Sequence, residues 1–260
     1  MPRVVATLAL ATSVLLVSAL AWSAPDNDTA TPESQLRSYP STPPDFALTA
    51  GLRGGIWRQS LGPLNRTLES RGFSATNSSH LLLGAEVELS FGRLHLFLTA
   101  ESVDSSDSNA TQTPGVRANL SSGGVGLGIA PELWRTARVS AYPVASLQAQ
   151  NFQVLFNGEP TPVPVPTAWS VPEGSRASTS LVFLGAGLRV DTRWYLWGNG
   201  GERNFLVFGG RLMWMQQLLQ GNWTMRLGDE GAQQDIAGPT LNASGPVGLL
   251  TLGFSTERRN

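Results

Sequence analysis

The feature that most constrains this chain is a strict alternation of apolar and polar residues along segments of about ten residues. It is clearest in 81–101, where apolar side chains occupy every second position on both sides of Phe91-Gly92-Arg93. A period of two gives a β-strand two different faces. A tilted strand needs about ten residues to cross the hydrocarbon core of a bilayer. This segment therefore predicts a hairpin of two membrane-spanning strands.

The same alternation recurs in six further segments, which brings the predicted total to about eight strands. These segments are 46–57, 116–129, 137–150, 183–196, 205–216 and 245–256. Segment 116–129 changes parity along its length, because Ala118 and Leu120 fall on one face and Leu127 and Ile129 on the other. A β-bulge near Gly123-Gly124 would bring both halves onto the same face.

The connections between these segments alternate between two lengths. Three are short, at 91–93, 130–135 and 198–203. The others are long and polar, at 58–79, 103–115, 156–178 and 218–243. Bacterial outer-membrane barrels have short turns in the periplasm and long loops outside the cell. The predicted fold class is therefore all-β, a closed antiparallel up-and-down transmembrane β-barrel of about eight strands.

The N-terminal region reads as a signal and a tail ahead of the barrel. Residues 1–23 carry Arg3, an apolar stretch and small residues, the pattern of a signal peptide; the alternative is a transmembrane anchor over Val4–Trp22. Residues 24–45 are polar and proline-rich, which indicates a flexible periplasmic tail. The outer-membrane barrel is then expected over 46–257.

Composition excludes several other classes of function. A formal net charge of -1 provides no global field for binding nucleic acid. The chain has no cysteine, which excludes a disulfide framework, a thiolate zinc site and a lipidated cysteine. No cofactor and no metal site are predicted.

The whole pattern resembles the small eight-stranded outer-membrane barrels, such as the transmembrane domain of OmpA and its OmpX and OmpW relatives. The resemblance is architectural and covers about 46–256. It implies an outer-membrane location, with membrane lipid as partner and the barrel-assembly machinery engaged during biogenesis. Those families end on an aromatic residue, whereas here Phe254 is followed by six more residues. We do not expect a peptidoglycan-anchoring role of the OmpA kind.

The polar face of the predicted strands is rich in charge. Eight strands enclose an interior that side chains fill, so charges pointing inward must pair. We expect a static polar plug, with a narrow selective pore as the alternative. The expected network comprises Arg53, Glu86, Glu88, Arg93, His95, Glu101, Arg138, Arg189, Asp191, Arg193 and Arg211.

Aromatic residues gather near the short-turn ends of the strands. Transmembrane barrels carry aromatic girdles at the membrane–water interfaces. The expected girdle comprises Phe46, Phe91, Trp134, Trp194, Trp197, Phe205 and Phe254.

The favoured function is a non-enzymatic structural or surface-interaction barrel, with the four long loops as candidate partner sites. A narrow channel for small solutes is the second hypothesis. The third is a lipid A-modifying enzyme that would use His80 as base for Ser78 or Ser79. A fourth is a soluble, lipocalin-like periplasmic binder with its apolar face inward.

Overall fold

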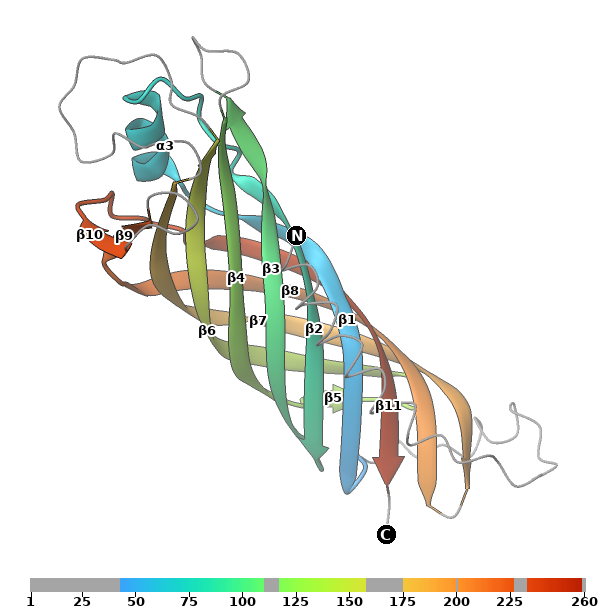
Figure 1. The fold of residues 1–260 in the computed structure, drawn as a ribbon. Helices are drawn as coiled ribbons and strands as arrows, with labels where there is room; N and C mark the ends of the chain where they lie inside the picture. The colour runs from blue at the N-terminus through green and yellow to red at the C-terminus, as the bar shows by residue number, and fades with distance from the viewer. Residues whose placement is uncertain (1–42, 110–116, 158–174, 200, 227–232, 259–260) are drawn as a thin grey trace.

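Eight long strands form a closed antiparallel barrel in the computed structural model (Figure 1). The structure describes residues 43–109, 117–157, 175–199, 201–226 and 233–258. The barrel strands are β1 (Phe46–Arg58), β2 (Ser79–Phe91), β3 (Leu94–Asn109), β4 (Arg117–Pro131), β6 (Val139–Asn157), β7 (Arg176–Asn199), β8 (Glu202–Gln220) and β11 (Gly245–Arg258). Pairing of β1 with β11 and of β6 with β7 closes the ring. The predicted fold class is confirmed, with one strand for each predicted segment.

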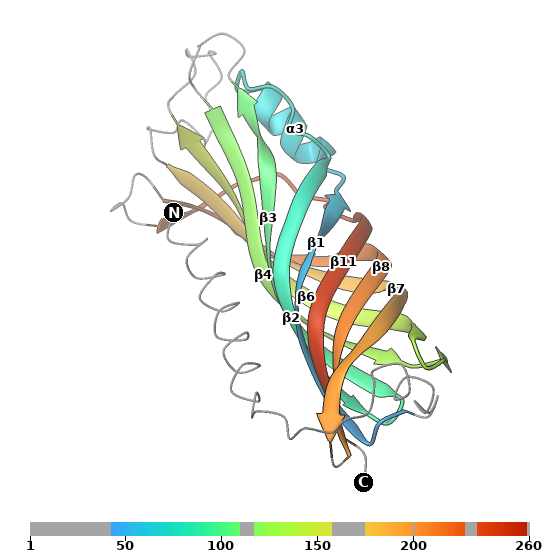
Figure 2. The same cartoon turned by 90° about the vertical axis from the view of Figure 1, so that its right-hand side faces the viewer.

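Four smaller elements lie at the two ends of the barrel. The helix α3 (Gly62–Glu69) and the hairpin of β9 (Trp223–Arg226) and β10 (Gln233–Ile236) lie at one end, as Figures 1 and 2 show. Strand β9 pairs with the start of β7, beyond the residues that pair with β8. The two-residue β5 (Trp134–Arg135) lies at the other end, paired with β6. No helix in the described ranges is long and apolar enough to cross a membrane.

The short turns and the long connections lie at opposite ends, as expected. The tightest short turn, between β2 and β3, contains Gly92 with a φ of 58°, a conformation that glycine adopts without strain. The long connections are more structured than expected: 58–79 contains α3, 218–243 contains β9 and β10, and strands extend into the other two. The predicted signal peptide, 1–23, and nearly all of the predicted tail lie outside the described residues.

The outer face of the barrel is a belt of exposed apolar side chains. Leu98 and Leu127 are each 61% exposed, and the belt continues around the ring. Its other large members include Leu52, Ile56, Leu83, Ile129, Leu147, Leu184, Leu188, Leu212, Trp214, Leu250 and Leu252. A water-soluble protein does not expose a continuous apolar surface of this kind, whereas hydrocarbon solvates it. The alternative of a soluble barrel with its apolar face inward is therefore wrong.

Polarity reverses along β4 and β6. In the belt, Leu127 points outward, and farther along the same strand the outward position is Asn119. The inner face changes in the opposite sense, because Leu120 and Val154 are buried inside the barrel at this level. A strand shows this exchange where it leaves lipid and enters water. Strands β4 and β6, together with β3 and β7 that pair with them, therefore extend beyond the bilayer at the long-loop end. Figure 1 shows the long β3 and β4 strands reaching that end of the barrel.

The expected bulge at Gly123-Gly124 is absent. Strand β4 pairs with β6 in unbroken register from Arg117 to Ile129. The register shift in this part of the sheet lies on β3 instead, between Asp104 and Asp107. The change of apolar parity in the sequence thus marks the membrane surface and not a bulge.

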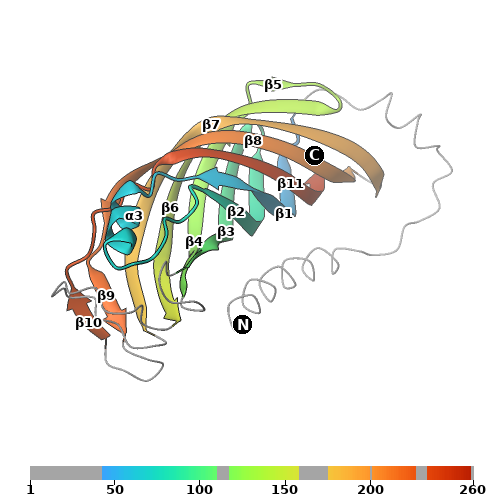
Figure 3. The same ribbon diagram turned by 90° about the horizontal axis from the view of Figure 1, so that it is seen from above.

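An apolar core fills the interior at the long-loop end. Trp57 packs edge-on against Phe183, with ring centroids 4.9 Å apart. Helix α3 contributes Leu64 and Leu68, which lie four residues apart on one face and are buried in the same core. Seen from above in Figure 3, α3 lies at the same end of the molecule as β9 and β10. The outer half of the lumen is closed by ordinary side-chain packing.

Candidate functional site

An ionic layer occupies the lumen between the apolar core and the short-turn end. Its side chains come from inward positions of the barrel strands, and all are buried. Nine of the predicted network residues lie here: Arg53, Glu86, Glu88, His95, Glu101, Arg189, Asp191, Arg193 and Arg211.

Glu86 is the centre of this layer. Its carboxylate lies 3.3 Å from Arg53, 2.9 Å from Arg189 and 2.8 Å from Arg211. The three guanidinium groups come from β1, β7 and β8, so one carboxylate ties together strands from opposite sides of the barrel. Buried charges require such pairing, because an isolated charge in a medium of low dielectric constant is very costly.

The remaining charges of the central layer are paired in turn. Arg53 and Gln150 both donate hydrogen bonds to Glu101. Arg189 also bonds to Glu88 and to Asp191. The guanidinium of Arg211 stacks over the ring of Phe97, 4.6 Å from its centroid. The layer is a connected network that spans the cross-section of the barrel.

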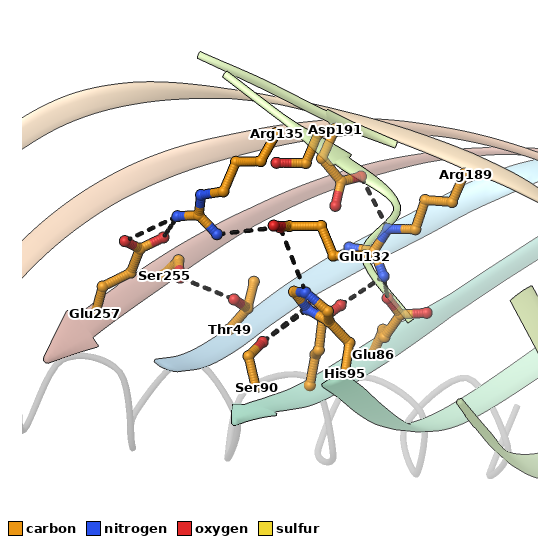
Figure 4. A network of polar contacts seen from close by, with 12 residues as sticks. Thr49, Glu86, Ser90, His95, Glu132, Arg135, Arg189, Asp191, Ser255 and Glu257 are labelled. Carbon is orange, nitrogen blue, oxygen red and sulfur yellow. Dashed lines mark hydrogen bonds and ion pairs between the residues drawn. The ribbon is translucent and has the colours of Figure 1, made fainter. Parts of the chain in front are cut away.

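His95 marks the periplasmic edge of the layer (Figure 4). Its Nδ1 lies 2.7 Å from the Glu88 carboxylate and 2.7 Å from Ser90 Oγ. The ring also packs edge-on against Tyr142, with centroids 4.5 Å apart. A histidine that activates a serine must keep the facing nitrogen free to accept its proton. Here a carboxylate competes for that nitrogen, so the geometry favours an ion pair over a nucleophilic serine.

The turn between β4 and β6 folds back over the periplasmic opening. Its Glu132 lies 3.7 Å from Nε2 of His95 and 3.1 Å from Arg135. Arg135 reaches across to Glu257 on β11, at 3.1 Å, as Figure 4 shows. Burial alone would raise the pKa of Glu132, but the contacts with His95 and Arg135 lower it below its usual range. Glu132 is therefore ionised at neutral pH.

A pocket enters the lumen beside these residues. Its volume is about 310 Å³, counted with the part open to solvent. Its walls include Glu88, Arg189 and Glu257, which are already paired. The apolar core closes the lumen at its other end. In the described residues, no group of three or more His, Asp or Glu side chains is arranged to hold a metal ion.

Two residues of the expected network lie outside it. Arg93 and Arg138 are exposed. Arg93 belongs to the turn between β2 and β3, and Arg138 comes one residue before β6 begins, so neither follows the alternation of a strand. Alternation predicts the direction of a side chain only within a paired strand.

One residue of the expected girdle was also misplaced. Phe205 is buried inside the barrel, where its ring packs 5.8 Å from that of Tyr195. It occupies one of the alternate positions of β8 that point inward. Because the residue is apolar, the sequence pattern assigned it to the outer face. The other six girdle residues lie on the outer surface: Phe46, Phe91, Trp134 and Trp194 are exposed, and Trp197 and Phe254 are half-buried against each other.

Several members of the ionic layer were not predicted as such. They are Ser90, Glu132, Arg135, Tyr142, Gln150 and Glu257. The alternation of the last predicted strand, 245–256, continued by one residue, would have included Glu257. Nothing in the local sequence indicates that the turn carrying Glu132 and Arg135 folds inward.

The predicted pairing of His80 with a neighbouring serine is wrong. His80 is only 2% exposed and lies inside the barrel, paired across the sheet with Trp57. Ser79 is its neighbour on the strand and faces the opposite side, and Ser78 is exposed before the strand begins. Adjacent strand residues cannot meet, because successive side chains point to opposite faces.

Comparison with known proteins adds only a general likeness. No family model matches the sequence, and no curated protein is significantly similar to it. The structure resembles a major outer membrane protein from Thermus thermophilus, with 14% identity and a TM-score of 0.46 over 80% of this chain and 98% of that one. It resembles the outer membrane protease OmpT from Escherichia coli at 8% identity and a TM-score of 0.32, over 85% of this chain and 99% of that one.

The physical features of the chain itself define its class. The barrel is closed, so no strand edge is left unpaired within the membrane. Its outer belt is apolar, its lumen is ionic, and short turns alternate with long connections. This combination is that of an outer-membrane β-barrel protein.

Proposed function

We propose that this barrel is a non-conducting membrane anchor that holds a folded platform outside the cell for contact with surface partners. The platform consists of the strand ends beyond the bilayer, helix α3 and the hairpin of β9 and β10. In this proposal the lumen serves stability, and the strands and connections beyond the bilayer serve interaction. The role is structural and requires no catalysis.

The observation that supports the proposal is that two layers of side chains, one ionic and one apolar, fill the lumen one after the other along its length. The central part is filled by the ion-paired layer around Glu86. The outer part is filled by the apolar core around Trp57 and Phe183. A conducting pore needs a continuous water-filled path, and the packed side chains of either layer would interrupt it.

The platform is supported by its own packing. Aromatic contacts join the loop after α3 to β6, with Phe73 and Phe156 at 5.7 Å, and join β6 to β9, with Phe152 and Trp223 at 6.3 Å. Trp223 also donates a hydrogen bond from its indole nitrogen to the Pro239 carbonyl, at 2.8 Å. A packed assembly of this kind presents a fixed surface, which lowers the entropy cost of binding a partner.

Reconstitution of the full barrel in planar bilayers tests the proposal. We expect no reproducible conductance steps, with a porin as positive control. Steps in the wild type that change in size in Arg211→Gln would arise in the lumen and would contradict the proposal. Steps that are identical in Arg211→Gln would come from a contaminating porin and would leave the wild type non-conducting.

A further inference from the structure

The turn at residues 131–136, which we call the strap, is built differently from the other short turns. Hairpins of outer-membrane barrels leave their turns in the periplasm, whereas the strap puts two charged side chains into the lumen. Both Glu132 and Arg135 have side chains that are at most 4% exposed. Its backbone is held at three points, where Glu132 donates to the Arg93 carbonyl, Leu133 to that of Ala141 and Thr136 to that of Val139.

Each inward side chain of the strap fastens to a different wall. Glu132 faces His95 on β3, and Arg135 pairs with Glu257 on β11. Glu257 is held in place by Arg193, at 2.9 Å. The strap thus crosses the opening of the pocket. Ionic contacts hold it to the barrel wall at both ends, and one of these contacts involves a histidine.

The surroundings of His95 determine what its protonation does. On β2 it faces Glu88 and Ser90, and on the strap it faces Glu132. Arg189 on β7, itself paired with Glu88, and the ring of Tyr142 on β6 complete this environment.

Among the remaining charged residues that line the same pocket, each has a fixed partner. Asp191 is bound to Arg189, and Arg193 to Glu257, to which Arg135 is also bound. Histidine is the one side-chain type among these whose ordinary pKa lies close to neutral pH, which makes His95 the candidate for a pH response in this pocket.

The two ring nitrogens of His95 face two carboxylates. Nδ1 faces Glu88, and Nε2 faces Glu132 without any hydrogen bond other than this ionic contact. When both nitrogens carry a proton, the imidazolium attracts both carboxylates. When His95 is neutral, Glu88 keeps its ion pair with Arg189 and Glu132 keeps only its ion pair with Arg135, so the attraction that holds the strap to β3 is lost.

We propose that the strap is a pH-dependent latch on the periplasmic opening of the lumen, closed when His95 is protonated and loosened when it is neutral. Loosening would uncover the pocket to the periplasm. It would leave the barrel wall and the outer apolar core unchanged, because no barrel strand pairs through the strap alone.

The way the latch responds to pH follows from the protonation of His95 and of Glu132. As pH rises and His95 loses its proton, the attraction for Glu132 is lost and the strap loosens. At the acid end, Glu132 itself takes up a proton, and its lowered pKa places this below the usual range for a glutamate. The latch is therefore closed at intermediate, mildly acidic pH and opens toward alkaline pH.

A spin label on the strap tests the proposal in the full barrel in lipid. The chain has no cysteine, so Leu133→Cys is a unique labelling site, and Leu133 is 71% exposed. We expect the ratio of mobile to immobile label to rise about tenfold between about pH 6 and about pH 9. A tenfold change corresponds to the loss of one charge interaction that is equivalent to about one pKa unit. A label at Glu202→Cys, an exposed position where β8 begins after the turn from β7, should show no change.

Two further variants separate the latch from a general effect of pH. His95→Gln removes the charge, and we expect a mobile label at both pH values. Ser90→Ala removes a contact to the same ring but no charge, and we expect the wild-type response. Circular dichroism verifies that each variant is folded. An unchanged label in the wild type, or an equal pH response in His95→Gln, would overturn the proposal.

Discussion

Replacing Glu86 with Gln should lower the free energy of unfolding by about 3–5 kcal/mol, the cost of breaking a buried ion pair by removing one partner. Glu86 is the shared acceptor of Arg53, Arg189 and Arg211. An amide keeps the shape of the carboxylate but removes its charge, so three guanidinium groups lose their common counterion. The loss therefore falls on three strands at once, β1, β7 and β8.

Unfolding by urea in lipid vesicles measures this effect. Glu69→Gln on the exposed surface of α3 is the matched control, with an expected change within about 0.5 kcal/mol. The double variant Glu86→Gln/Arg211→Leu should recover part of the loss, because one unpaired cation is removed together with the carboxylate. If Glu86→Gln were as stable as Glu69→Gln, the ionic layer would not hold the barrel together.

A charge placed in the apolar belt should be nearly as damaging. Leu98 points outward from β3 within the belt, and Leu98→Arg should destabilise the barrel by about 2–4 kcal/mol, the cost of an arginine at the midplane of a bilayer. The matched control is Ser180→Arg on β7, an exposed position on the outer face beyond the belt. There the expected cost is about 0–1 kcal/mol, as for positions near the interface.

The comparison of these two arginine variants is more informative than either alone. Both substitutions add the same side chain to an outward strand position, so β-propensity and chain entropy change in similar ways. The difference in unfolding free energy in vesicles then reports the surrounding solvent. Equal costs at the two positions would mean that both lie in lipid or both in water, and either result contradicts the described membrane boundary.

Sequence alternation predicted the barrel well because it is a local property of each strand. In β2, apolar and polar residues alternate without exception from Leu83 to Glu88, and the paired strand has the directions this implies. The direction of an inward charge such as Glu86 or Arg189 follows from the same count. Fold and most of the ionic layer could therefore be predicted.

The interpretation of 116–129 failed for a physical reason. Apolar residues there change from one parity to the other because lipid is outside at Leu127 and protein packing is inside at Leu120. A bulge and a change of solvent produce the same pattern in one strand. Only the neighbouring strand β6, with Val154 inside at the level of Leu120, distinguishes them.

The strap could not be predicted because it depends on contacts distant in the sequence. Arg135 and Glu257 are 122 residues apart, and no periodicity links a turn with the last strand. Glu132 and Arg135 in a short polar turn are indistinguishable from residues that face water. Turn residues such as Arg93 and Arg138 have the same local character and do face water.

The strands leave the bilayer partway along their length, so that their outer face meets lipid toward the short-turn end and water toward the long-loop end. Single spin labels on the outer face of β4 and β6 test this boundary directly, at Leu127 and Leu147 in the belt and at Ser121 and Asn151 beyond it. The collision rates with apolar oxygen and with a water-soluble nickel complex distinguish the two solvents. We predict that oxygen dominates at Leu127 and Leu147 and that nickel dominates at Ser121 and Asn151. Oxygen dominating at all four positions would contradict the account.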